Sequence, residues 1–207
     1  MPVVSTESSD ALSCAVGALR AGMAVVVPTD TVYGLAALAR DARGVAAIFA
    51  LKARPQEVAL PVLVANLDQA LTLASDRDRL SLLGGAFWPG ALTVVVERAP
   101  GIALALGGDP ATIGLRCPDA EFVRLLAAEV GPLAVTSANR HGDEPCTTVA
   151  QVREIFGDEH LIVDGGTRDA PVSTVVSLVG GRVELLRVGA LRLDELSDAL
   201  GESRPLG

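Results

Sequence analysis

The stretch AVVVPTDTVYGLAA, residues 24–37, joins a core strand to a cluster of polar side chains. One alanine and three valines open it and a proline ends the apolar run, so the pattern predicts a buried strand over residues 24–27. Thr29, Asp30 and Thr31 follow at once, and a turn or a helix cap would account for them if they stood alone. A strand end is also where the loops of an α/β domain converge on a binding site.

Short apolar runs of the same kind recur along the chain, with helical periodicity between most of them. The runs predict strands over residues 24–27, 61–64, 92–96, 112–115, 133–135, 161–163, 174–178 and 183–186. The periodic segments predict helices over residues 9–21, 44–51, 76–87, 120–130 and 149–156, and a C-terminal helix over about 192–201.

The composition favours the α/β class. Half of the 207 residues are hydrophobic and only 3% are aromatic, so the core must be built from Ala, Val and Leu, the mixture expected where helices cover a sheet. The order of elements predicts an open, twisted, mixed β-sheet flanked by helices. Without repeats or long linkers, we expect a single domain over residues 1–207, with its core over about 9–190 and a frayed tail from residue 201.

The charge of the chain limits the ligands it can bind. The formal net charge is −8, which disfavours a general polyanion binder because the summed field repels phosphate backbones. An anion must therefore be bound by a local cluster of cations. Sixteen of the 17 basic residues are arginine and Lys52 is the only lysine, which suggests a position that needs a compact ammonium group, although chance would also explain it.

Several common classes of site are excluded by the residues present. Cys14, Cys117 and Cys146 are far apart and in no CxxC pattern, so they indicate a reducing cytoplasm rather than disulfides or zinc. The two histidines, His141 and His160, leave little material for a catalytic triad or a metal site. No phosphate-binding P-loop, dinucleotide fingerprint or nucleophile elbow is present. We also expect neither a signal peptide nor a membrane span.

Seven short polar motifs lie at the edges of the apolar runs. Alone, each has an ordinary explanation, such as a turn, a helix cap or a charge at a helix C-terminus. Together, their hydroxyls and amides beside four cations would suit an anionic, phosphate-bearing ligand. The motifs are PTDT (28–31), KARP (52–55), WPG (88–90), TIGLRCP (112–118), TSAN (136–139), STVV (173–176) and LLRVG (185–189).

In this order, PTDTVYGL, KAR, FWPGALT, IGLRCP, TSAN, STVV and LRVG resemble the YrdC/TsaC family of threonylcarbamoyl-AMP synthases, over about residues 11–190. The resemblance implies a sheet with a concave ligand-binding face. It also implies a nucleotidyltransferase that joins L-threonine, bicarbonate and ATP into threonylcarbamoyl-adenylate and releases pyrophosphate. A partner transferase complex would then pass the threonylcarbamoyl group to the adenosine beside the anticodon of tRNAs that read ANN codons.

The resemblance also implies roles for particular residues, and a guanidinium is suited to clamp the amino-acid carboxylate. The positions that match the threonine site are Thr31, Arg116 and Ser173. The positions that match the ATP site are Lys52, Arg54, Thr112, Ser137, Asn139 and Arg187, with Lys52 and Arg54 also matching the catalytic pair.

These motifs contain no conventional general base. The chemistry can proceed without one, because the threonine amine can form a carbamate whose oxygen attacks the α-phosphorus while the protein aligns the reactants. Mg²⁺ is expected on the phosphates rather than in an all-protein cage, since it dehydrates reluctantly.

Three positions depart from the usual family pattern, namely Ala59, Val172 and Ser177, and they put the threonine subsite in question. A non-catalytic protein that binds RNA on the concave face is an alternative, against which net acidity and few aromatic residues argue. A paralogue that performs another carbamoyl transfer is a second alternative. We expect a cytoplasmic protein, and the sequence leaves open whether it makes a weak direct contact with tRNA.

Overall fold

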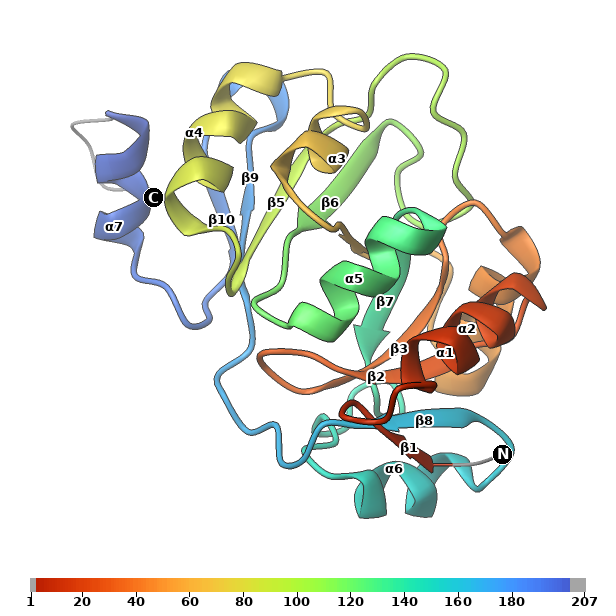
Figure 1. The fold of residues 1–207 in the computed structure, drawn as a ribbon. Coiled ribbons are helices and arrows are strands. Elements are labelled where there is room, and N and C mark those ends of the chain that lie inside the picture. The colour runs from red at the N-terminus through yellow and green to blue at the C-terminus, as the bar shows by residue number, and fades with distance from the viewer. Residues whose placement is uncertain (1–2, 202–207) are drawn as a thin grey trace.

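The computed structural model describes residues 3–201, so the predicted frayed tail lies outside the described residues apart from Gly201. Ten strands form one mixed sheet in the order β1-β8-β2-β3-β7-β4-β6-β5-β9-β10. Figure 1 shows the strand direction turning from β8 to β9, as the natural twist of a sheet requires. The strands are β1 (Val3–Ser5), β2 (Val25–Pro28), β3 (Tyr33–Leu38), β4 (Val62–Leu63), β5 (Leu92–Glu97), β6 (Thr112–Arg116), β7 (Leu133–Ser137), β8 (Leu161–Asp164), β9 (Thr174–Ser177) and β10 (Glu184–Arg187).

Helices pack on both faces of the sheet, which confirms the predicted architecture. α1 and α5 lie side by side (Figure 1) and share one apolar cluster, while α2, α4 and α6 contribute to the other. No helix within residues 3–201 is long and apolar enough to cross a membrane. The helices are α1 (Ala11–Arg20), α2 (Ala42–Lys52), α3 (Leu67–Leu71), α4 (Arg77–Phe87), α5 (Glu121–Val130), α6 (Val149–Phe156) and α7 (Leu193–Leu200), and a 3-10 turn spans Val179–Gly181.

Strand β2 shows why the opening stretch of sequence decides the fold. Val25, Val26 and Val27 are all fully buried. Because successive side chains of a strand point to opposite faces, Val25 and Val27 join the cluster under α1 and α5, whereas Val26 joins the cluster on the other face. A continuous apolar run is what a strand covered on both faces requires.

The sequence patterns missed three elements. β3 pairs antiparallel with β2 from Val25 opposite Ala36 to Pro28 opposite Tyr33, yet Gly34 and the preceding polar residues made this segment look like a loop. β1 and α3 are only three and five residues long, which is too short for a periodic signal. The polar cluster between β2 and β3 is thus the tip of a hairpin.

One connection crosses the whole sheet. β8 and β9 are consecutive in sequence, but six strands lie between them in the sheet. Residues 165–173 make the crossing, and Figure 1 shows this segment running from the β8 end of the sheet to the β9 end. The fully buried Tyr33 anchors its start, since its hydroxyl lies 2.7 Å from the carbonyl oxygen of Gly166 and accepts a hydrogen bond from Gly165 N at 3.2 Å.

The end of the crossing packs tightly against the LRVG motif. A Cβ atom on Gly189 would lie 2.4 Å from both Ser173 C and Thr174 N. The backbone of Ala190 also donates a hydrogen bond to Val172 O at 3.0 Å. The glycine therefore permits direct contact between two backbones next to Ser173, a predicted site residue.

We expect Gly189→Ala to lower the free energy of unfolding by about 1–3 kcal/mol, because backbone atoms must move to admit the methyl group. Gly17→Ala is the matched control. It lies in α1 with nothing within 4 Å of the added Cβ, and it should raise stability by up to about 1 kcal/mol through helix propensity. Urea unfolding followed by circular dichroism measures both. Equal effects of the two substitutions would contradict this account.

Candidate active site

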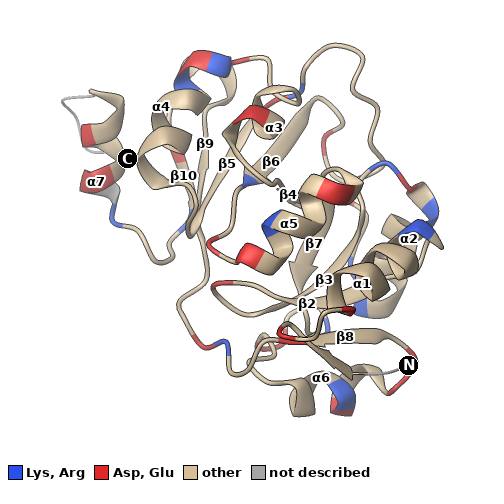
Figure 2. Ribbon diagram, viewed as in Figure 1, with Lys and Arg blue, Asp and Glu red and all other residues tan. Residues whose placement is uncertain are grey.

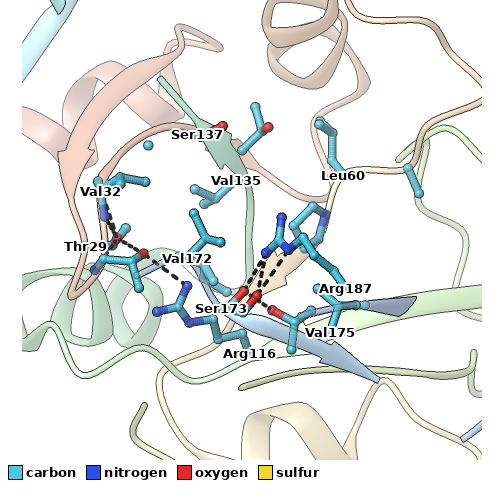
Figure 3. Close-up of a pocket in the computed structure, with 18 of the residues that line it drawn as sticks. Thr29, Val32, Leu60, Arg116, Val135, Ser137, Val172, Ser173, Val175 and Arg187 are labelled. Carbon is cyan, nitrogen blue, oxygen red and sulfur yellow. Dashed lines mark hydrogen bonds between the residues drawn. The ribbon is translucent and has the colours of Figure 1, made fainter. Parts of the chain in front are cut away.

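A cavity of about 350 Å³ opens over the middle of the sheet. Its walls come from the β2–β3 hairpin, from strands β4 to β7, and from the segments that carry β9 and β10, so residues distant in sequence meet here. Figure 3 shows Arg187 extending to Ser173, and Arg116, from another strand, extending toward the part of the hairpin that carries Thr29. Seven of the nine predicted site residues line the cavity: Thr31, Arg54, Thr112, Arg116, Ser137, Ser173 and Arg187.

The other two predicted residues, Lys52 and Asn139, lie behind the wall that Ser137 forms. The Lys52 side chain is 1% exposed. Its Nζ donates to Ser137 O at 2.6 Å, to Asn139 Oδ1 at 2.7 Å and to Asn139 O at 2.8 Å. Ser137 Oγ donates to Asn139 Oδ1 at 2.6 Å as well. The ammonium group uses its three donors to hold the end of β7, which fixes the position of the Ser137 hydroxyl.

The end of α2 explains why Lys52 and Arg54 are two residues apart. Ala53 caps the helix with a φ of +50°. Among residues 3–201, it is the only residue other than glycine that has a positive φ. This left-handed conformation ends the helix between the two cations. Lys52 consequently points into the protein, while Arg54 reaches the cavity.

Burial changes the acid–base behaviour of Lys52. Desolvation, followed by the positive charge of Arg54, lowers the pKa of the ammonium group to about 8. Asp143 and Cys146 act in the opposite direction. Lys52 is therefore close to titration in the slightly alkaline range, unlike an ordinary surface lysine.

Arg54 and Arg187 enter the cavity with only neutral hydrogen-bond acceptors among the described residues. Arg54 donates to Val58 O at 2.8 Å and Ala59 O at 2.9 Å, and Arg187 donates to Ser173 O at 2.8 Å. Burial and, next, the charge of Arg187 lower the pKa of Arg54, and burial and the charge of Arg116 do the same for Arg187. The charge of Arg187 thus acts on Arg54 and that of Arg116 acts on Arg187, and we call the three guanidinium groups the arginine row.

Ser173 joins this row to a residue that the sequence motifs did not single out. Its Oγ accepts from Arg187 Nη2 at 2.9 Å and lies 3.0 Å from Thr93 Oγ1. Thr93 lines the cavity and is 5% exposed. The residue belongs to the motif FWPGALT, so the motif indicated the segment, but only the parallel pairing of Thr93 with Val175 places its hydroxyl beside Ser173.

Arg116 occupies the opposite end of the row and is held at three points. Its Nη2 contacts Asp30 Oδ1 at 2.6 Å, its Nε donates to Gly90 O at 3.0 Å, and its Nη1 lies 3.4 Å from Thr31 Oγ1. The Arg116 and Asp30 side chains are only 8% and 14% exposed. The polar hairpin tip and the WPG turn therefore both contact this guanidinium group.

The remaining lining is apolar or hydroxylic. Leu60, Leu106, Ile113 and Val175 contribute an apolar surface, and hydroxyl groups of several Thr and Ser residues supply donors and acceptors. Within residues 3–201, no acidic residue lines the cavity. Figure 2 shows basic and acidic stretches interspersed over the helices, so the cationic character is local to the cavity. Such a site is complementary to a small polyanion with an apolar portion.

The described residues do not form a metal cage. No group of three or more His, Cys, Asp or Glu side chains within residues 3–201 is arranged to hold a metal ion. Hydroxyl groups alone are a weak donor set for a divalent cation. A divalent ion in this cavity would need most of its ligands from a bound anion and water.

Comparisons with known proteins show the family to which the chain belongs. The family model Sua5/YciO/YrdC, described as telomere recombination, matches residues 17–189. The chain is 38% identical over 198 residues to a protein of Mycobacterium tuberculosis (strain H37Rv) named putative threonylcarbamoyl-AMP synthase, covering 94% of this chain and 91% of the relative. It is 37% identical over 194 residues to the threonylcarbamoyl-AMP synthase of Pyrococcus abyssi, covering 92% of this chain and 57% of the relative.

Solved structures give the same result. The Pyrococcus abyssi Sua5 structure in complex with L-threonine matches with a TM-score of 0.88 and 33% identity, over 98% of this chain and 62% of that chain. This chain thus spans about three fifths of the archaeal protein. Escherichia coli YciO, at 20% identity and a TM-score of 0.83, shares the fold. With a family match over most of its length and relatives above one-third identity, the chain belongs to the Sua5/YciO/YrdC family.

Proposed function

We propose that this chain is a threonylcarbamoyl-AMP synthase. The amine of L-threonine adds to CO₂ derived from bicarbonate and loses a proton, which gives a carbamate. A carbamate oxygen then attacks the α-phosphorus of ATP, and the bond to the β-phosphate oxygen breaks. The products are threonylcarbamoyl-adenylate and pyrophosphate.

The observation that carries this proposal is the row of three guanidinium groups in a cavity without a lining carboxylate among the described residues. ATP and threonine together present a triphosphate and a carboxylate, and bidentate arginine contacts suit both groups. The family relationship supplies the reaction, and relatives of 37–38% identity bear its name.

The substrates are proposed to divide the cavity between them. Threonine would lie against Arg116, Thr31 and Ser173, with its carboxylate on the guanidinium group. The triphosphate would lie against Arg54, Ser137, Thr112 and Arg187, with Lys52 and Asn139 completing the predicted set. The three donors of Lys52 are engaged with Ser137 and Asn139. Lys52 would therefore hold the Ser137 hydroxyl in position, and its positive charge would attract the phosphates without a direct hydrogen bond.

Catalysis on this proposal depends on alignment and electrostatics. The arginines are held by backbone carbonyls before substrate arrives, so little reorganisation is required when negative charge develops at the phosphorus. Mg²⁺ would enter on the phosphates of ATP, because the described residues offer no cage for it. It would supply further charge neutralisation when bound.

The product is unstable in water and needs an acceptor, and we propose that a tRNA threonylcarbamoyl-transferase complex consumes it. The formal net charge of −8 is consistent with no more than a weak tRNA contact by this chain. We propose the cytoplasm as its location, because tRNA modification takes place where tRNA is used.

The proposed function is tested by incubating the protein with ATP, Mg²⁺, bicarbonate and a panel of amino acids. We expect pyrophosphate release that depends on threonine and bicarbonate, and an adenylate of the corresponding mass by mass spectrometry. Salt-sensitive RNA binding without pyrophosphate release would instead identify a binding protein. Threonine-independent release of pyrophosphate from ATP, with carbamoyl phosphate supplying carbamate as it loses inorganic phosphate, would identify another carbamoyl transferase.

Lys52→Ala should reduce adenylate formation at least about tenfold, because the substitution removes a preorganised charge and frees the end of β7. Pyrophosphate release under saturating substrates measures the effect. Near-wild-type activity in a purified, folded variant would remove Lys52 from the mechanism. Circular dichroism and the melting temperature establish that the variant is folded.

Activity should also depend on the protonation of Lys52. Since the pKa of Lys52 is lowered to about 8, kcat/KM for ATP should fall about tenfold per pH unit above that value if the cation is required. Deprotonation of Lys52 should not lower the free energy of unfolding over this pH range. The unfolded chain binds the Lys52 proton up to about 10.5, so this group makes unfolding less favourable as pH rises between the two values. A flat profile to pH 10 at saturating threonine would contradict the requirement.

A further inference from the structure

The three arginines of the cavity differ in their partners. Arg54 and Arg187 donate to carbonyl and hydroxyl oxygens, and neither has a carboxylate partner among residues 3–201. Arg116 instead forms an ion pair with Asp30 at 2.6 Å, and both side chains are largely buried. The cavity therefore has two ends of different net charge, although the same residue type faces the ligand at both.

Asp30 is placed to act through Arg116. The carboxylate contacts Nη2 of Arg116 and does not itself line the cavity, whereas the guanidinium group does. With Nε bound to Gly90 O and Nη1 near Thr31 Oγ1, rotation of the group is restricted. The guanidinium group, which lines the cavity, therefore keeps a fixed orientation toward an incoming carboxylate.

The pair also determines which anions bind well at this end. Charges interact strongly where solvent is excluded, so a dianionic phosphate at Arg116 would be repelled by the neighbouring Asp30 carboxylate. The same phosphate meets positive charge at Arg54 and Arg187, whose partners among the described residues are neutral oxygens. A zwitterionic amino acid suffers less repulsion, because its own ammonium group offsets the negative charge.

We propose that Asp30 is a positioning and specificity-determining residue, which orients Arg116 for the carboxylate of a zwitterionic amino acid and keeps phosphate groups from that end of the cavity. The inference rests on the proposed function and deepens it. It assigns a purpose to the acidic residue of the hairpin tip, which belongs to neither predicted substrate set.

The test is Asp30→Asn, which retains an oxygen acceptor and removes the charge. We expect the KM for threonine to rise about tenfold, as loss of a charged partner in a buried pair does to binding. The KM for ATP should change less than about twofold, since Arg54 and Arg187 are untouched. Inorganic phosphate should become a competitive inhibitor against threonine in the variant, whereas in the wild type it should compete only with ATP.

Two further variants complete the experiment. Asp158→Asn removes a carboxylate that contacts Arg153 at the same distance of 2.6 Å on the exposed surface, and all three readouts should match the wild type. Asp30→Glu keeps the charge and should retain the discrimination against phosphate, even if the threonine KM shifts.

The outcomes separate the inference from the function on which it rests. An unchanged threonine KM in Asp30→Asn, an equal rise in both KM values, or the same phosphate competition as in the wild type would overturn the role of Asp30. Thermal-shift titration with inorganic phosphate alone gives a readout without turnover, and the variant should bind phosphate more tightly than the wild type. A wild-type protein that releases no threonine-dependent pyrophosphate would refute the proposed function, and the phosphate titration would still report on Asp30.

Discussion

The buried ammonium group of Lys52 connects the end of helix α2 to the end of strand β7. A charge that is 1% exposed is costly unless its hydrogen bonds are complete, and here Ser137 O and both the carbonyl and side-chain oxygens of Asn139 complete them. The hydroxyl of Ser137 and the turn that follows it consequently have one arrangement. A lysine suits this position because its three donors radiate from a single atom, whereas the planar fork of arginine would demand a wider set of acceptors.

The arginines of the cavity wall are also held by hydrogen bonds to oxygen atoms of the protein. Backbone carbonyls fix Arg54 and Arg187, and a carboxylate fixes Arg116. Side chains that are already immobilised lose little further entropy when a ligand binds. The arginines are therefore held in place by contacts with loop residues, and these loops depend on the strands that bring them together.

The sequence was informative where a pattern had one physical cause. Buried runs such as Val25–Val27 predicted strands correctly, and seven of the nine predicted site residues line one cavity. The patterns could not show that Lys52 points inward, since the direction depends on the left-handed conformation of Ala53. Nor could they show the partnership of Thr93 with Ser173, which depends on which strands are neighbours. The roles of the site residues remain predictions.

Residues 165–173, which connect β8 to β9 across the sheet, limit the distance between the two ends of the sheet. Seven inter-strand spacings of about 4.8 Å would put β8 and β9 about 34 Å apart in a planar sheet. The ten steps from Asp164 to Thr174 span at most about 36 Å when fully stretched, and the chain also turns at Gly166, where φ is +78°. The connection therefore has little slack, and it limits how far apart the two ends of the sheet can lie. The connection also carries Val172 and Ser173 to the cavity over the middle strands, so a longer connection would relax both the separation of the sheet ends and the placement of these two residues.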